Sequence, residues 1–309
     1  MDGGDDYMRE TSSSSSDCSS LTDSSCSDSE DCPDDLPVNA NCNNPQDLLD
    51  IIEDARKTMQ DPAKKKRNGV TIALLGSSGC GKSTVIRKIF VDAIYGSKDY
   101  ITSIHTNSST SDAFAKLPKD VIVFPVGLDH NAILYCYHTN SKYEKKYNFV
   151  NILDDVLGIR YDTLVRDMFL IYRNTNITSV VSVQYPKLVP VAVRSSVYFT
   201  FAFDFNNEEA IEIIVRGWMQ GYLEGDNIQQ KMETYREWSR GGQSSDSRGH
   251  RFFLLDNLHH TAYCVTEDYI CYELAPVKRR RSGDKTSSLT TQRTRGSIPL
   301  KKSRKVPKR

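Results

Sequence analysis

The stretch GSSGCGKST, residues 76–84, has the residue types and the spacing of a phosphate-binding loop. It fits the pattern G-x-x-x-x-G-K-[ST], in which glycines let the backbone N–H groups close around phosphate oxygens. Lys82 is placed to reach the β- and γ-phosphates, and the Ser83 hydroxyl to ligate Mg²⁺. The pattern therefore predicts a site for a nucleotide and its magnesium ion. The residues assigned to this site are Gly76, Ser77, Ser78, Gly79, Cys80, Gly81, Lys82, Ser83 and Thr84.

The segments on both sides of the loop favour the same interpretation. The apolar run VTIALL, residues 70–75, is typical of a strand buried on both faces. Residues 83–95 have a helical pattern, and a helix N-terminus adds partial positive charge beside a bound phosphate. A glycine-rich loop that binds nothing is the weaker alternative. Because Cys80 lies next to this helix N-terminus and to a lysine, we expect its thiol to have some thiolate character and to be covered by bound phosphates.

Polar residues also follow two later apolar runs. Asp154 and Asp155 end the segment FVNILDD, and Gln184 follows SVVSV. Beside a phosphate loop, Asp154 would hold Mg²⁺ through water, and Asp155 would polarise the attacking water. Polar groups at the carboxyl ends of parallel strands lie where ligands bind, which makes Gln184 a third candidate. The alternatives are an ordinary acidic turn and a loop glutamine without a role.

The middle of the chain alternates strand and helix patterns, which predicts an α/β domain with a mostly parallel sheet over residues 46–275. Besides 70–75, the expected strands are 101–106, 121–126, 149–153, 179–183 and 197–203; the expected helices are 46–59, 83–95, 160–172, 208–223 and 227–239; and residues 250–257 and 260–266 form a late β pair.

The two ends of the chain carry opposite charge. Residues 1–36 contain eleven Asp or Glu against one Arg, and residues 278–309 contain thirteen Lys or Arg against one Asp. Segments 1–45 and 276–309 have few large apolar residues, so they are expected to be disordered tails. The basic clusters KRRR and KKSRKVPKR in the second tail suggest a nuclear import signal or a DNA anchor.

No apolar stretch reaches membrane-spanning length, and the acidic, serine-rich start does not fit a signal peptide. The chain is therefore expected in the cytosol or nucleus, where thiols stay reduced. Free thiols are expected at the early cysteines, whose spacing does not fit a zinc site. These are Cys18, Cys26, Cys32 and Cys42.

The phosphate loop, NILDDVL and the segment YRNTNITSVVSVQYPKLVPVAVRSSVYFTFAFDFNNEEAIEIIV together resemble the genome-packaging ATPases of large DNA viruses and Maverick/Polinton elements. This poxvirus-type group belongs to the FtsK/HerA superfamily, and the resemblance covers residues 46–270. It implies a RecA-like P-loop core in which the Gln184 strand lies between the phosphate-loop strand and the Asp154–Asp155 strand. It also implies ATP and Mg²⁺ as cofactors, and a homo-oligomeric ring that drives double-stranded DNA into a preformed capsid. Capsid or portal-like vertex proteins would be its partners, in the host nucleus, a cytoplasmic viral factory or the virion.

The resemblance also implies roles for individual residues. Asp154 is the metal carboxylate, Asp155 stands at the position of the catalytic acid, and Gln184 senses the γ-phosphate. Family members commonly have Glu at the position of Asp155, and Asp is shorter by one methylene. We expect Arg194 to be the arginine finger that reaches a neighbour's nucleotide, with Arg173 as the alternative.

Three other functions fit parts of the sequence. A small-molecule kinase carries a similar loop, but it needs an acceptor pocket, and no segment of the chain identifies one. A GTPase needs an Asn/Thr-Lys-x-Asp segment, which the chain lacks. A non-catalytic DNA- or capsid-binding adaptor would not need Lys82, Ser83 and Asp154 intact.

Overall fold

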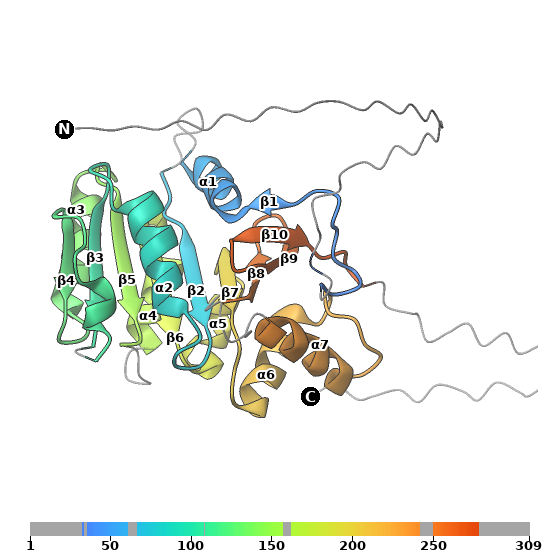
Figure 1. Ribbon diagram of the computed structural model, residues 1–309. Coiled ribbons are helices and arrows are strands. Elements are labelled where there is room, and N and C mark those ends of the chain that lie inside the picture. Colours follow the sequence, from blue (N-terminus) through green and yellow to red (C-terminus); the bar gives the residue numbers. More distant parts are fainter. Residues whose placement is uncertain are drawn as a thin grey trace, which may run out of the picture.

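The structure is a computed structural model that describes residues 33, 36–60, 67–107, 109–156, 162–241 and 250–277. It is built on one ten-stranded sheet with the strand order β1-β10-β9-β8-β7-β2-β6-β5-β3-β4 (Figure 1). The strands are β1 (Gln46–Asp47), β2 (Thr71–Leu75), β3 (Ile101–Thr106), β4 (Val121–Phe124), β5 (Phe149–Asp154), β6 (Ile177–Val183), β7 (Phe199–Ala202), β8 (Phe252–Asp256), β9 (Thr261–Val265) and β10 (Ile270–Glu273).

The parallel part of the sheet contains the strands that precede the predicted site residues. β6 pairs in parallel with β2 on one side and with β5 on the other. The Gln184 strand therefore lies between the phosphate-loop strand and the Asp154–Asp155 strand, as the resemblance implies. From β7 onward the neighbours β8, β9, β10 and β1 are antiparallel, and β8 and β9 confirm the predicted late β pair. The predicted α/β class with a mostly parallel P-loop sheet is confirmed.

Helices cover both faces of the sheet. They are α1 (Leu48–Met59), α2 (Lys82–Val85) with its π-helical continuation η1 (Ile86–Tyr95), α3 (His130–Lys142), α4 (Asp162–Leu170), α5 (Val191–Arg194), α6 (Glu208–Ile214) with its continuation η6 (Val215–Met219), and α7 (Ile228–Gly241). Side chains of β2 alternate between two cores. Ala73 and Leu75 pack with α3, α4, α6 and α7, and Ile72 and Leu74 pack with α1 and the α2–η1 helix. Burial on both faces explains why this strand is a continuous apolar run.

Most of the expected strands and helices lie within a few residues of the observed ones. Asn207 caps α6 by accepting a hydrogen bond from the Glu209 N–H at 2.8 Å. The helix expected at 208–223 ends earlier, at Met219. Helix α3 was not predicted, because only Ile133, Cys136 and Asn140 of this helix are buried and they form no wide apolar stripe. Strand β10 was also missed: it has four residues, and only two of them are buried.

Contacts with the domain begin before the predicted boundary at residue 46. Ala40 forms a β-bridge with Leu274, and the Asn39 side chain donates to the carbonyls of Tyr222 and Ala275, both at 2.8 Å. Together with the hydrogen bond from the Asn41 N–H to Glu273 O at 2.8 Å, these contacts place residues 39–41 against the domain. The acidic residues 1–32 and the basic segment 278–309 lie outside the described residues. Cys42 is disulfide-bonded, so the expected free thiol is wrong at this position. Within the described ranges, no helix combines the length and apolarity needed to cross a membrane.

Candidate functional site

The phosphate loop connects the end of β2 to the start of α2. Gly79 has φ +79° and Gly81 has φ +96°, a left-handed backbone that glycine adopts without steric cost. A Cβ atom at Gly81 would also lie 2.3 Å from two ring carbons of His250. The backbone conformation favours glycine at both positions, and the close approach of His250 is a second reason at Gly81. The helix then begins at Lys82, so its unpaired N–H groups face the loop.

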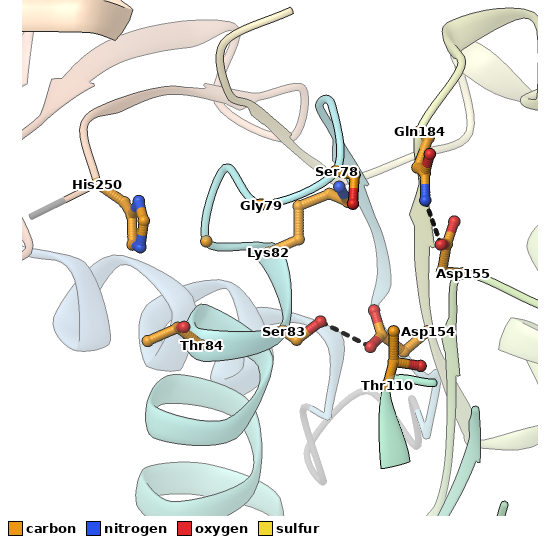
Figure 2. Close-up of a pocket in the computed structure, with 11 residues that line it drawn as sticks. Ser78, Gly79, Lys82, Ser83, Thr84, Thr110, Asp154, Asp155, Gln184 and His250 are labelled. Atoms are coloured by element: carbon orange, nitrogen blue, oxygen red, sulfur yellow. Dashed lines mark hydrogen bonds between the residues drawn. The ribbon is translucent and has the colours of Figure 1, made fainter. Parts of the chain in front are cut away.

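A cavity of about 190 Å³ lies beside this loop, and most of the predicted site residues line it (Figure 2). It is lined by Ser78, Gly79, Gly81, Lys82, Ser83, Thr84, Thr110, Asp154, Asp155, Gln184 and His250. The polar ends of three neighbouring parallel strands thus meet at one edge of the sheet, as expected for a ligand site in this architecture. Of the predicted residues, Gly76, Ser77, Cys80 and Arg194 are not part of the lining.

The Lys82 side chain folds back onto the start of the phosphate loop. Its side chain is buried, and its Nζ donates to the carbonyl oxygens of Gly76 and Ser77, both at 2.7 Å. These carbonyls hold the ammonium at the cavity wall, where phosphate oxygens would be stronger, charged acceptors. The arrangement places one positive charge beside the N-terminus of α2, and both features attract an anion.

Ser83 and Asp154 form the part of the site that suits a metal ion. The Ser83 hydroxyl donates to Asp154 Oδ2 at 2.7 Å, and Asp154 is fully buried at the end of β5. Its Oδ1 has no hydrogen-bond partner among the described residues, and a buried carboxylate oxygen without a partner is costly. Mg²⁺ prefers oxygen ligands, keeps several waters and binds through one or two carboxylates. The hydroxyl and the unpaired carboxylate oxygen fit that ion, held directly or through its waters.

Asp155 and Gln184 contact each other across the ends of β5 and β6. Gln184 Nε2 donates to Asp155 Oδ2 (Figure 2). The Asp155 backbone has φ +56°, and two hydrogen bonds hold it there: its N–H donates to Ser182 O at 3.2 Å, and its carbonyl accepts from Asn107 Nδ2 at 2.7 Å. A non-glycine residue in this conformation is unusual and is often found at functional sites. Residues from both neighbouring strands therefore hold the Asp155 backbone, and Gln184 holds its carboxylate.

The surroundings of Asp155 shift the pKa of its carboxyl group. Burial raises the pKa of Asp155 above its usual value, whereas the hydrogen bond from Gln184 and the charge of Lys82 lower it, and the charge of Asp154 raises it. We expect Gln184→Ala to raise this pKa further, because it removes a donor to the charged form. If the carboxylate must be ionised for catalysis, the acid limb of the pH profile of kcat/KM moves to higher pH. The matched control is Gln229→Ala, on the exposed face of α7. An unshifted limb in Gln184→Ala would show that this contact does not tune Asp155.

The surroundings of Cys80 differ from those expected for a reactive thiol. Its Sγ lies 3.7 Å from Lys82 Nζ and packs with the core beneath the loop, outside the cavity lining. Burial raises the pKa of the Cys80 thiol, and the opposing effect of Lys82 is smaller. The expected thiolate character is therefore wrong, because loss of solvent outweighs the nearby positive charge. The position contributes backbone to the loop rather than a reactive thiol.

Arg194 is held away from the cavity. Its guanidinium lies over the Trp218 ring, 4.4 Å from the centroid, and its Nε donates to Val189 O at 3.3 Å. Arg173 precedes β6, at the opposite sheet edge from Gln184, and donates to Ser196 O at 3.2 Å. Neither arginine serves the nucleotide pocket of its own chain in this arrangement.

Sequence reasoning missed three residues of the site. Thr110 lines the cavity from the segment after β3, and its hydroxyl is 2.6 Å from that of Thr106. Asn107 holds the backbone of Asp155, and His250 lines the cavity from the segment before β8. The position of Asn107 directly after a parallel strand was the available signal for the first two. No local pattern marks His250.

Neither a protein-family model nor a curated protein matches the chain. Among solved structures, it is similar to the genome packaging NTPase B204 from Sulfolobus turreted icosahedral virus 2 in complex with AMP, with TM-score 0.43, 12% identity and coverage of 63% of this chain and 96% of that one. B204 from Sulfolobus turreted icosahedral virus, described as a DNA-packaging ATPase, has TM-score 0.43, 13% identity and coverage of 64% and 97%. The cytoplasmic domain of the type VII secretion ATPase EccC from Thermomonospora curvata has TM-score 0.41, 10% identity and coverage of 69% and 26%. At these values the likeness decides neither family nor function.

Proposed function

We propose that this chain is an ATP-hydrolysing motor that packages double-stranded DNA into a preformed viral capsid. The observation that supports hydrolysis most directly is the convergence of Lys82, Ser83, Asp154, Asp155 and Gln184 on one cavity. A phosphate anchor, a metal carboxylate and a second carboxylate held by an amide are the groups that transfer of a γ-phosphoryl group to water requires.

In the proposed reaction, a water oxygen attacks the γ-phosphorus while the bond to the β–γ bridging oxygen breaks. Asp155 orients this water and accepts its proton, and the amide of Gln184 turns from Asp155 to a γ-phosphate oxygen. Lys82 leaves the carbonyls of Gly76 and Ser77 and binds the β- and γ-phosphate oxygens, where negative charge develops. Mg²⁺ bound at Ser83 and Asp154 would supply further positive charge to these oxygens.

DNA translocation and the ring are supported by the sequence resemblance, and DNA binding also by the positive charge of residues 278–309. The thirteen Lys or Arg of residues 278–309 suit sequence-independent binding to phosphate backbones. In a ring, Arg194 is the proposed residue that acts on a neighbour's nucleotide, which requires it to leave Trp218. Capsid or portal-like vertex proteins are the proposed docking partners, in the host nucleus, a cytoplasmic viral factory or the virion.

Phosphate release from Mg-ATP, measured with and without duplex DNA, tests this proposal. We expect the full chain to hydrolyse ATP. In the presence of DNA, the rate of phosphate release should be several-fold higher at low salt than at high salt. A single-turnover reaction with γ-labelled ATP distinguishes the motor from a kinase and from a non-catalytic adaptor. Label that passes to a small-molecule acceptor would identify a kinase, and DNA binding without any hydrolysis would identify an adaptor. Either outcome contradicts the motor.

A further inference from the structure

His250 reaches the phosphate loop from a distant part of the chain. It lies two residues before β8, and its ring packs against Gly81, so that a Cβ at Gly81 would lie 2.3 Å from the ring carbons Cγ and Cδ2. Figure 2 shows the ring beside the loop on the side of Thr84, with Asp155 and Gln184 on the other side of Lys82. The cavity thus has a carboxylate end and an imidazole end.

The orientation of a nucleotide in this cavity follows from its chemistry. Transfer of the γ-phosphoryl group requires the γ-phosphate to lie near Asp155 and Gln184, the groups proposed to act on water and on that phosphate. The remaining phosphates then follow the loop toward Thr84 and the N-terminus of α2. The ribose and the base leave the loop at the imidazole end, where His250 forms the wall.

The imidazole is suited to contact a flat aromatic ligand. Burial and, to a lesser extent, the positive charge of Lys88 lower the pKa of His250 below its usual value, which favours the neutral imidazole. Within the described part of the chain, no hydrogen bond engages this ring. The next residue is firmly anchored: Arg251 donates to Glu267 at 2.9 Å and lies over the Trp238 ring, 4.7 Å from its centroid. These contacts anchor the residue next to His250, while the imidazole itself lines the cavity.

We propose that His250 is the base-contacting residue of this site, and that its imidazole stacks on the nucleobase of the bound nucleoside triphosphate. This inference rests on the proposed nucleotide site and goes beyond it by assigning the base subsite. Stacking uses the face of the base and does not read its edge, so the contact strengthens binding of ATP and GTP alike.

Calorimetric titration of Mg-ATP and of magnesium tripolyphosphate into the full chain tests this assignment. The variants are His250→Ala, His250→Phe and, as a matched control, His138→Ala on the exposed face of α3. Since an aromatic–base contact commonly contributes a tenfold or larger factor in affinity, we expect His250→Ala to raise the Kd for ATP by about tenfold or more. Tripolyphosphate, which lacks a base, should bind equally to all variants, and His250→Phe should restore ATP affinity.

Three results would contradict the assignment. An unchanged Kd for ATP in His250→Ala means that the base does not contact this ring. Equal weakening of ATP and tripolyphosphate means that His250 supports the loop through Gly81 instead. Failure of His250→Phe to restore affinity in a protein with wild-type thermal unfolding also excludes stacking. By contrast, wild-type protein that binds neither ligand would overturn the nucleotide site itself.

Discussion

Lys82→Ala is expected to abolish ATP hydrolysis and to weaken nucleotide binding. The buried ammonium lies 2.7 Å from the carbonyl oxygens of Gly76 and Ser77, at the wall of the cavity where the β- and γ-phosphates would lie. Loss of a donor that acts where charge develops in the transition state lowers kcat by at least about a hundredfold. Steady-state phosphate release and equilibrium nucleotide binding measure the two effects.

The control is Lys57→Ala, which removes an exposed lysine of α1 that lies 3.8 Å from Glu53. It should hydrolyse ATP at the wild-type rate, because surface ion pairs contribute little. Thermal unfolding of Lys82→Ala separates a catalytic loss from a folding defect. Near-normal turnover in folded Lys82→Ala would rule out the phosphate-loop mechanism.

Asp155→Asn is expected to bind Mg-ATP with nearly wild-type affinity and to hydrolyse it at least about a hundredfold more slowly, since an amide cannot accept the proton of the attacking water. The side chain lies half-buried at the cavity and accepts a hydrogen bond from Gln184, whereas Asp154 holds Ser83. Asp154→Asn should therefore differ: it should mainly raise the magnesium concentration needed for binding and turnover. A nucleotide-binding assay and a magnesium titration of the rate distinguish the two carboxylates.

The control is Asp99→Asn, at an exposed residue after η1. It should leave nucleotide affinity and the rate of hydrolysis unchanged. If Asp155→Asn loses nucleotide binding as severely as Lys82→Ala, the roles assigned to the acidic pair are wrong. If Asp155→Asn hydrolyses ATP at the wild-type rate, Asp155 is not the group that acts on water.

The phosphate loop and the parallel strands that lead to it were predictable from the sequence because their signals are local. A short apolar run, glycines at fixed spacing, a lysine and a helix start are adjacent in the chain, and each has a direct conformational cause. The acidic pair and Gln184 were found for a related reason: each follows a strand, and the carboxyl ends of parallel strands share one edge.

The contacts that complete the site were decided by packing between distant segments. The amide of Gln184 meets Asp155, Asn107 holds the Asp155 backbone, and His250 packs against Gly81, although none of these pairs is close in sequence. Burial also reversed the expected ionisation of Cys80, since the cost of desolvating a charge depends on every neighbour of the thiol. Local patterns specify which segments form strands and loops, whereas strand order and side-chain packing decide which of their residues meet.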